Sequence, residues 1–516
     1  MRDGAPPPSS ASAPVCRICW ESTCEANGSD AFLTPTPCAC RDERSNVHQD
    51  CLERWILEAR SQGRFECGTV CHACGAEYSH PALDQTVLSA IAKAAVPSGA
   101  SREHDTREPI AIVGGTGYVG RGVCLHLVNH PTFRLGAVVG SAATAGKPFS
   151  AVFEKKEEAL VEHYGADLWK PQRFPQEFMS VRVSSVEEVI ARGECRAALS
   201  FIAPEHGEIE DALGAAGIKV FSISPHARFD PANPLSVPEA NPETLRDAVA
   251  ASFANKRKDA RSLVKSPNCV TCGVAVALKA LDDVKKWGGV RDVAITTFQS
   301  LSGRGDAKYP RELVMGNVYP LKGTVERTGE YQKGELKRLM PGVEKVSVGA
   351  YRVPVQKGHL VDVRVRFKRT NDFRDSNSGA RTAKQPTAAE IKEAFERFDP
   401  LRDAPLPSKP RRVVVVKPLD APAGLGSSAA APPPPRLGTP RPKDDCDFEN
   451  GMAVCVGNID VEDDCFDVAF CVVVNNVARG AWGAAMLNAE YWAYLRNRKP
   501  GESAFGSDDA ERERVS

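Results

Sequence analysis

The chain has 516 residues, which suggests about two to four domains. Hydrophobic residues make up 42% and charged residues 26%, a composition typical of folded globular proteins that excludes global disorder. Lysine plus arginine equals aspartate plus glutamate at 66 each, so no net charge would attract nucleic acid or an acidic membrane. No apolar stretch approaches the roughly 18 residues of a membrane span, and the first residues lack the pattern of a secretory signal.

The 17 cysteines are distributed unevenly along the chain. Nine of them lie between Cys16 and Cys74, and only eight follow. Such a dense block indicates a separate small module. Because nothing in the sequence directs export, bound metal explains this block better than disulfides do.

Four closely spaced pairs in this block supply candidate metal ligands. They are Cys16 with Cys19, Cys38 with Cys40, His48 with Cys51, and Cys71 with Cys74. Each pair can sit on a tight turn and reach one ion, so the pairs predict two closed, structural zinc sites. A module of this size has too small a core to fold alone, and zinc would supply much of its folding energy.

The block resembles the RING-CH (RING-variant) fingers in three pieces, VCRICWE, PCACRDERSNVHQDCLERWI and CHAC. The resemblance implies interleaved sites, with one zinc on Cys16, Cys19, His48 and Cys51 and the other on Cys38, Cys40, Cys71 and Cys74. It also implies a ubiquitin ligase that docks a ubiquitin-conjugating enzyme on a shallow groove containing Ile18 and Trp55. The alternative is that these two residues form only the small core of the module.

The pattern of apolar and polar residues changes after a polar segment at 96–108. From Pro109 on, apolar strand-like stretches alternate with helical ones, which predicts an α/β fold with a parallel sheet. Residues 290–303 are expected to be a strand that enters a glycine-rich turn, and residues 343–367 a hairpin of two long strands. The low-complexity segment 420–444 is expected to be a solvated insertion.

A glycine-rich turn follows the first of these strands. IAIVGGTGYVG places Gly114, Gly117 and Gly120 where a backbone can turn tightly and bring a pyrophosphate to a helix N-terminus. The candidate cofactor-binding residues here are Gly114, Thr116, Gly117, Tyr118, Val119 and Gly120. An NAD site favours an acidic residue after the second strand, whereas this chain has GSAATAGK. Its Ser141, Thr144 and Lys147 suit the 2′-phosphate of NADP, and NAD is the alternative.

One cysteine of this second part stands at the expected start of a helix. KSPNCVTCG places Cys269 directly after Asn268 and ahead of the helical run VAVALKALDDV. A thiolate at a helix N-terminus is a good nucleophile, although a single cysteine is more often a buried apolar side chain. His359 in RVPVQKGHL is a candidate base for it, and Arg352 is a candidate anion clamp.

From about Pro109 to Arg496 the chain resembles the aspartate-semialdehyde dehydrogenases of the archaeal and fungal type. The matching pieces follow the order of that family: GGTGYVG, NHPTFRL, SAATAGK, RFDPANPLSVPEANPETL, SPNCVTCG, TTFQSLSG, GEYQK, YRVPVQKGH and NNVARGAWGAAMLNAE. The resemblance implies that Cys269 is the nucleophile and His359 the acid/base. It further implies an acyl-orienting Gln299, a carboxylate-binding Arg352, amine and phosphate contacts from Glu330 and Lys333, a substrate-binding Asn268 and a nicotinamide-amide partner in Asn476.

The implied reaction is the NADP-dependent reductive dephosphorylation of L-aspartyl 4-phosphate to L-aspartate 4-semialdehyde. Cys269 attacks the acyl phosphate, phosphate leaves, and NADPH delivers a hydride to the thioester while His359 handles the proton. A thioester is more reducible than a carboxylate and is held covalently beside the cofactor. The alternatives are a malonyl-CoA reductase-like acyl-CoA reductase and a ubiquitin ligase with a non-catalytic dehydrogenase-like platform.

Together, these observations predict a Rossmann-like domain and an α+β catalytic and dimerisation domain, which a zinc-stabilised finger precedes. The expected parts are a disordered tail (1–14), the RING-CH finger (15–79), a linker (80–108), the NADP-binding domain (109–265), the catalytic domain (266–474), a C-terminal helix that returns to the NADP-binding domain (475–500) and a disordered tail (501–516).

The resemblance also implies a homodimer or homotetramer, and neither nucleic acid nor membrane is an expected partner. The expected compartment is the cytoplasm, or a plastid if the N-terminus is incomplete. A further alternative is that the finger and the dehydrogenase-like part come from neighbouring reading frames joined in one sequence.

Overall fold

A computed structural model describes residues 32–34, 37, 46–53, 56, 105–164, 171–254, 263–303, 315–321, 327–368, 385–417, 438–461 and 465–498. The chain divides into two compact units. One comprises residues 1–107, 129–132 and 420–429, and the other comprises the rest. None of the helices in the described ranges is both long enough and apolar enough to cross a membrane.

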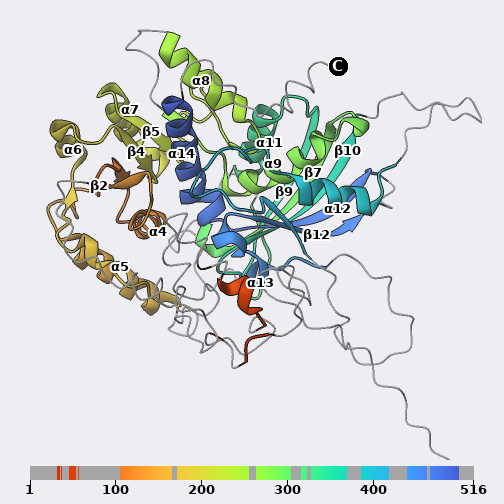
Figure 1. The fold of residues 1–516 in the computed structure, drawn as a ribbon, viewed down its shortest axis with the longest axis horizontal. Helices are drawn as coiled ribbons and strands as arrows, with labels where there is room; N and C mark the ends of the chain where they lie inside the picture. Colours follow the sequence, from red (N-terminus) through yellow and green to blue (C-terminus); the bar gives the residue numbers. More distant parts are fainter. Residues whose placement is uncertain are drawn as a thin grey trace, which may run out of the picture. The chain divides into compact units, whose positions relative to one another are not determined.

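The first sheet of the larger unit has six strands, all parallel, in the order β3-β2-β1-β4-β5-β6. Three of these strands, β2, β4 and β5, are labelled in Figure 1. Its strands are β1 (Glu108–Val113), β2 (Phe133–Val139), β3 (Val183–Ser184), β4 (Ala197–Ser200), β5 (Lys219–Ser222) and β6 (Leu263–Lys265). The central strand β1 is apolar on both faces because helices cover both sides of a parallel sheet. This strand order is that of dinucleotide-binding folds, so the predicted Rossmann-like domain is confirmed.

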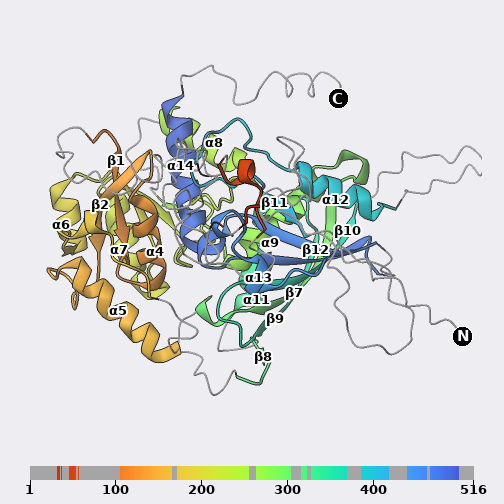
Figure 2. The same ribbon diagram turned by 60° about the horizontal axis from the view of Figure 1, so that its bottom comes forward.

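Hydrophobic cores lie on both faces of this sheet. On one face Ile110 and Ile112 pack with helices α4 (Tyr118–Leu127), α5 (Phe149–Tyr164) and α14 (Gly483–Asn497). On the other face Ala111 and Val113 pack with α6 (Val186–Arg192) and α7 (Gly207–Ala215). Helix α14 also contacts α8 (Pro242–Ala254), its neighbour in Figure 2. The chain therefore returns to its first sheet through its last described helix.

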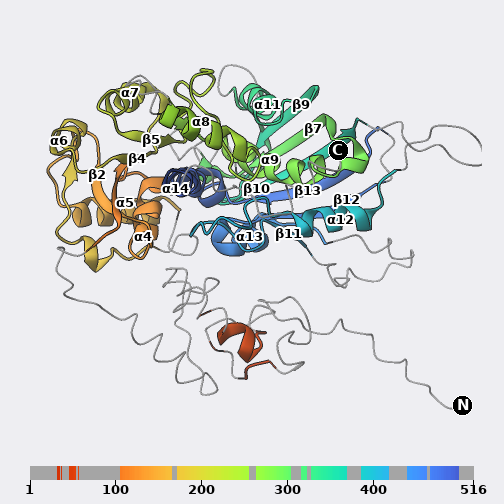
Figure 3. The same ribbon diagram turned by 45° about the horizontal axis from the view of Figure 1, so that its top comes forward.

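The second sheet has seven strands of mixed direction in the order β11-β12-β13-β10-β7-β9-β8. They are β7 (Val290–Gln299), β8 (Tyr319–Pro320), β9 (Lys345–Arg352), β10 (His359–Phe367), β11 (Val414–Val416), β12 (Val454–Asp460) and β13 (Val468–Val474). Every second residue of β10 is buried, which is typical of a sheet with one covered face. That face is covered by α9 (Cys269–Asp282), α11 (Thr328–Leu339) and α12 (Ala388–Arg397) (Figure 3).

The predicted hairpin at 343–367 is wrong. Both of its strands exist as β9 and β10, but β7 lies between them, parallel to β9 and antiparallel to β10. The linking segment 353–358 crosses the end of β7, where the Val353 N–H donates to the Gln299 carbonyl at 3.1 Å. Alternating side chains predict that a segment is a strand and which face it buries, but they do not identify its partner.

The end of the predicted solvated insertion also differs from expectation. Residues 438–444 belong to the fold, and the Asn458 N–H donates to the Gly438 carbonyl at 3.1 Å. A Cβ at Gly457 would lie 2.2 Å from the same carbonyl oxygen, so the two segments meet through their backbones. Helix α13 (Pro442–Asp445) follows, and its Asp445 accepts a hydrogen bond from Lys417 at 2.7 Å. Residues 420–437 of the insertion lie outside the described residues.

Candidate active site

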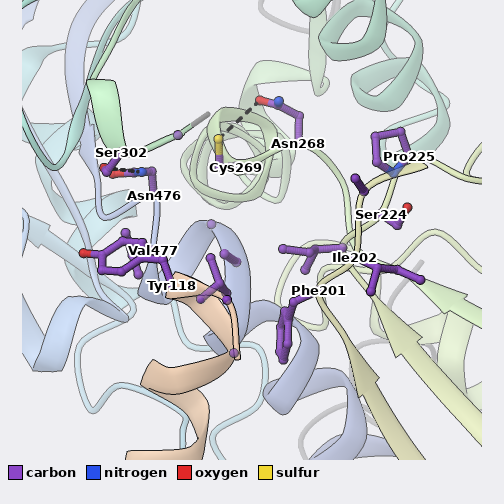
Figure 4. A pocket seen from close by; sticks show the side chains of 18 of the residues that line it. Tyr118, Phe201, Ile202, Ser224, Pro225, Asn268, Cys269, Ser302, Asn476 and Val477 are labelled. Carbon is purple, nitrogen blue, oxygen red and sulfur yellow. Dashed lines mark hydrogen bonds between the residues drawn. The ribbon is translucent and has the colours of Figure 1, made fainter. Parts of the chain in front are cut away.

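A cavity of about 440 Å³ opens at the carboxyl edge of the first sheet. Its lining includes the glycine turn at 117–120, the segments that follow β4, β5 and β6, and Asn476, Val477, Gly480 and Ala481. Figure 4 shows the sulfur of Cys269 facing this cavity, between Asn268 and the Asn476–Ser302 pair. Ligands of open α/β sheets bind at this edge, which makes the cavity the candidate active site.

The glycine turn has the predicted shape. Gly114 adopts φ +75°, a conformation that favours glycine, and its N–H donates to the Val139 carbonyl of the neighbouring strand at 2.9 Å. A Cβ at Gly120 would lie 2.3 Å from the Gly114 carbonyl oxygen, so α4 starts in direct contact with the turn. Residues 117–120 all line the cavity. Gly114 and Thr116 do not line it and support the turn from behind.

The three residues predicted for the NADP 2′-phosphate lie in the turn after β2. Ser141 and Lys147 are exposed, and the Ser141 and Thr144 hydroxyl oxygens are 3.5 Å apart. These residues do not line the cavity. However, β2 is parallel to β1, so their turn lies at the same edge of the sheet as the glycine turn. No acidic residue occurs at 140–147.

Cys269 is the first residue of α9. The Asn268 side chain caps this helix, since its Oδ1 accepts a hydrogen bond from the Val270 N–H at 3.0 Å. A Cβ at Gly480 would lie 2.5 Å from the Cβ of Cys269. The π-helical turn η8 (Ala478–Trp482) therefore packs directly against the backbone of this cysteine and holds it at the cavity.

The imidazole of His359 lies beside the sulfur, with Nε2 at 3.1 Å from the Cys269 Sγ. Burial, together with the nearby Arg352 guanidinium, lowers the pKa of His359 to about 3, so the ring is neutral at neutral pH. The Ser300 N–H donates to Nδ1 at 3.0 Å, so we assign the single ring proton to Nε2. His359 thus presents an N–H group to the sulfur of Cys269.

Strand register brings three of the predicted residues together at one end of the second sheet. Gln299 pairs with Arg352, and Leu360, the residue after His359, pairs with Phe298. The side chains of Gln299, Arg352 and His359 are all buried. The Arg352 Nη1 donates to the Ser300 carbonyl at 2.7 Å. Neither Gln299 nor Arg352 lines the cavity, so their contacts with substrate stay predictions.

Asn476 links the histidine strand to the cavity. Its Oδ1 accepts from the Gly358 N–H at 2.9 Å and from the Ser300 hydroxyl at 3.1 Å. Its Nδ2 donates to the Ser302 hydroxyl at 2.9 Å. Sequence reasoning missed both serines, although they lie inside the TTFQSLSG piece that carried the resemblance. The sequence signal that could have identified them is their position: both hydroxyl residues closely follow Gln299, a candidate site residue at the end of β7.

The face of α11 that lies toward Cys269 is not the one predicted from the GEYQK motif. Glu330 and Lys333 are both exposed and do not line the cavity. The buried face instead carries Gln332, which donates to the Asn268 Oδ1 at 3.1 Å, and Glu335, which accepts from the Asn268 N–H at 2.9 Å. Helical periodicity within GEYQKGEL could have found both of these buried residues. The substrate contacts of Glu330 and Lys333 remain predictions.

A buried polar cluster ties together the strand ends beneath the cavity wall. Glu210 accepts hydrogen bonds from the hydroxyls of Ser200 at 2.6 Å and Ser222 at 2.5 Å, the last residues of β4 and β5. Its other oxygen accepts from the ammonium of Lys265 at the end of β6. Burial lowers the pKa of Lys265, and the Glu210 charge opposes that shift. The three segments that follow these strands all line the cavity.

In the smaller unit, one predicted pair of zinc ligands falls in the described residues. The Cys51 Sγ lies 3.7 Å from the His48 Nδ1, and both side chains are buried. Ligands on one tetrahedral zinc, at about 2.3 Å for sulfur and 2.0 Å for nitrogen, lie about 3.6 Å apart, so the pair fits one zinc ion. The other predicted ligands lie outside the described residues: Cys16, Cys19, Cys38, Cys40, Cys71 and Cys74. Ile18 and Trp55 lie outside them as well.

Comparison with known proteins matches two models of one family to the larger unit. They are the semialdehyde dehydrogenase NAD-binding domain, over residues 109–248, and the semialdehyde dehydrogenase dimerisation domain, over residues 278–479. The chain belongs to the semialdehyde dehydrogenase family. A RING-variant domain model matches residues 16–74. Both predicted resemblances are therefore confirmed.

Similar aspartate-semialdehyde dehydrogenases match about three quarters of this chain over nearly their own full length. The aspartate-semialdehyde dehydrogenase of Schizosaccharomyces pombe is 29% identical over 74% of this chain and 96% of its own length. That of Archaeoglobus fulgidus is 29% identical over 74% of this chain and 97% of its own length. The crystal structure of the Candida albicans enzyme with NADP superposes with a TM-score of 0.60 and covers 76% of this chain and 99% of that one, at 24% identity. It confirms the fold.

Proposed function

We propose that this protein is an aspartate-semialdehyde dehydrogenase that forms L-aspartate 4-semialdehyde from L-aspartyl 4-phosphate with NADPH. The observation that carries the proposal is the Cys269–His359 pair, 3.1 Å apart, with Cys269 facing a cavity that begins at the glycine turn. The match to enzymes of that name over nearly their full length supports it.

In this proposal Cys269 is the nucleophile. His359 carries its proton on Nε2, so in this step the thiol proton of Cys269 leaves to solvent and the thiolate that forms accepts a hydrogen bond from the Nε2–H group. The sulfur attacks the acyl carbon, the bond to phosphate breaks, and a thioester joins the substrate to Cys269. Bound NADPH supplies the hydride that reduces the thioester. His359 then donates its hydrogen bond to the oxygen that gains charge, before the carbon–sulfur bond breaks.

The cofactor would occupy the wall built by the first sheet. The N–H groups at the start of α4 suit the pyrophosphate of the cofactor. Gly114 and Gly120 meet closely and carry no side chains, so no side chain of theirs blocks the pyrophosphate. Thr116, Tyr118 and Val119 complete this turn. Ser141, Thr144 and Lys147 would bind the 2′-phosphate, and Asn476 the nicotinamide amide. The lack of an acidic residue at 140–147 favours NADP over NAD.

The substrate would lie between Cys269 and α11. Asn268 lines the cavity beside the nucleophile and is the best-placed of the proposed substrate residues. For the others the proposal rests on the motif match: Gln299 for the acyl group, Arg352 for the carboxylate, and Glu330 with Lys333 for the amine and phosphate.

We also propose that two or four copies assemble through the second sheet. A dimerisation-domain model covers residues 278–479, and α9, α11 and α12 pack on one face of the sheet. The alternate residues of β10 point to the other face, where Asp362, Arg364 and Arg366 are partly exposed. Light scattering of the purified chain would measure its mass, and a monomer at micromolar concentration would contradict this proposal.

The activity is tested with the full chain, L-aspartate 4-semialdehyde, phosphate and NADP, by following the reduced cofactor. We expect phosphate-dependent reduction that is lost in Cys269→Ser. No reduction, or equal rates in both proteins, would overturn the proposal. Malonyl-CoA with NADPH is the parallel assay. Oxidation of NADPH there, without turnover of the semialdehyde, would favour the acyl-CoA reductase alternative.

For the finger we propose two structural zinc ions and a ubiquitin-conjugating enzyme as partner. The RING-variant match and the His48–Cys51 geometry support zinc. Elemental analysis should find two zinc ions per chain. Autoubiquitination across a panel of conjugating enzymes should depend on zinc and should be lost in Trp55→Ala. A metal-free chain would contradict the proposed zinc sites. No ubiquitin transfer with any enzyme of the panel would contradict the proposed partner.

A further inference from the structure

The nucleophile has a second thiol in the same helical turn. Cys269 and Cys272 form a C-x-x-C sequence at the start of α9, the arrangement of thiol–disulfide redox sites. Residues three apart lie on one face of a helix, with their Cα atoms about 5 Å apart. Disulfides join Cα atoms at about 4.4–6.8 Å, so the backbone of α9 is compatible with a bond between them.

Both sulfurs lie at the N-terminal end of the helix. The Cys272 S–H points back along the helix to the Pro267 carbonyl, 3.7 Å from the sulfur. The Cys269 sulfur lies 3.8 Å from the Asn268 Oδ1. Side chains of a helix tilt toward its N-terminus, which explains the direction of the Cys272 sulfur. Rotation about the side-chain bonds is the movement by which we expect the two sulfurs to meet.

The two thiols differ in exposure. Cys269 is partly exposed at the cavity, whereas Cys272 is fully buried and does not line it. Burial raises the pKa of the Cys272 thiol, and a negative charge on Cys269 raises it further. Cys272 therefore stays protonated and takes no part in the proposed reduction. An accessible reactive thiol beside a second, shielded one is the arrangement of reversible redox cysteines.

We propose that Cys272 is a resolving thiol that traps an oxidised Cys269 as a reversible disulfide within α9. The inference rests on the proposed function only in taking Cys269 as the reactive thiol. A peroxide oxidises the Cys269 thiolate to a sulfenic acid and is itself reduced to hydroxide. The Cys272 sulfur then attacks the Cys269 sulfur. The sulfur–sulfur bond forms, the sulfur–oxygen bond breaks, and the hydroxyl leaves with the Cys272 proton as water.

The disulfide would block the nucleophile and also protect it. Further oxidation of a sulfenic acid gives sulfinic and sulfonic acids, which dithiols do not reverse. A disulfide within the first turn of α9 is instead reduced by a dithiol, which returns Cys269 to its place beside His359. Peroxide would thus switch the enzyme off reversibly rather than destroy it.

The direct test is the mass of one peptide. Trypsin cuts after Lys265 and Lys279, which leaves both cysteines in the peptide of residues 266–279. The full chain is treated with hydrogen peroxide, alkylated and digested. We expect this peptide to be two hydrogens lighter and unalkylated, and to take two alkyl groups after dithiothreitol. A peptide with Cys269 oxidised to sulfinic acid and Cys272 alkylated would overturn the proposal, whether or not the protein is active.

The matched variants are Cys272→Ser and Cys124→Ser. Cys124 is another buried helical cysteine whose thiol pKa is raised by burial, and it lies in α4. After peroxide and then dithiothreitol, wild type and Cys124→Ser should regain activity several-fold more completely than Cys272→Ser. Equal recovery in all three proteins would overturn the proposal. If Cys272→Ser fails to fold, the peptide mass of the wild-type chain decides.

Discussion

The two walls of the active-site cavity are built in different ways. The wall of the first sheet consists of the glycine turn, where the start of α4 meets the Gly114 carbonyl closely, and the segments that leave β4 and β5. The opposite wall consists of side chains, with Cys269 at a helix start and Asn476 beside the strand of His359. The glycine turn of the first wall is therefore sensitive to added atoms, whereas the second wall depends on the side-chain atoms of Cys269 and Asn476.

The largest effect is expected at the nucleophile. Cys269→Ser should lower kcat by about 10³-fold or more, because a hydroxyl at this position cannot form the thioester. The midpoint of thermal unfolding and the affinity for NADP should stay close to those of wild type, since the serine side chain is similar in size. Cys124→Ser is the matched control for loss of a thiol outside the cavity. A Cys269→Ser protein with more than a tenth of wild-type kcat would show that another group attacks the substrate.

The next effect is expected at the imidazole beside the sulfur. His359→Asn removes the Nε2–H group and should lower kcat by about 10²- to 10⁴-fold. Steady-state kinetics of the variant measures this loss. Binding of NADP should hardly change, because His359 does not line the cavity. A variant that loses cofactor affinity in proportion to kcat would mean that His359 supports the fold of the site rather than the reaction.

The glycine turn is tested by adding a single carbon atom. In Gly120→Ala the new Cβ would lie 2.3 Å from the Gly114 carbonyl oxygen, so the turn must shift. We expect a loss of stability of about 1–3 kcal/mol, together with weaker NADP binding. Denaturant unfolding and cofactor titration measure these two effects. Gly193→Ala in a surface turn is a control, because its Cβ would meet nothing within 4 Å although its φ is also positive. Equal cofactor affinity in both variants would contradict the assignment of this turn.

The smallest effect concerns stability at low pH. The pKa of His359 falls from 6.5 to about 3 on folding, so below pH 6.5 the unfolded chain takes up a proton that the folded chain does not. This contribution to stability is therefore complete above pH 6.5 and is lost progressively toward pH 3. Urea midpoints at several pH values should fall less steeply in His359→Asn than in wild type. Parallel curves for the two proteins would show that the imidazole is solvated or charged in the fold.

The parts of the site that short motifs carry were predictable from sequence. The glycine turn and Cys269 each depend on residues that are adjacent in the chain, so their local pattern contains the needed geometry. The pairing of β9 was not predictable, because the residues of β7 that pair with it come 53 positions earlier and alternation does not identify a partner. Only the folded register shows that Gln299, Arg352 and His359 share one end of the sheet.

Side-chain direction was the other feature that sequence did not reveal. The GEYQK motif led to Glu330 and Lys333, but the helix buries Gln332 and Glu335 instead. The protonated nitrogen of His359 depends on the Ser300 N–H, a backbone group that no motif identifies. Such contacts arise from tertiary packing of segments that are distant in the chain.

The most direct test of the account is to find the substrate on Cys269. The full chain is mixed with aspartyl phosphate in the absence of NADPH, quenched in acid and digested with trypsin. We expect the peptide of residues 266–279 to gain the mass of an aspartyl group. This adduct should disappear when NADPH is added before the quench, and it should not form as a thioester in Cys269→Ser. An active protein with no adduct, or with the adduct on another peptide, would contradict the account.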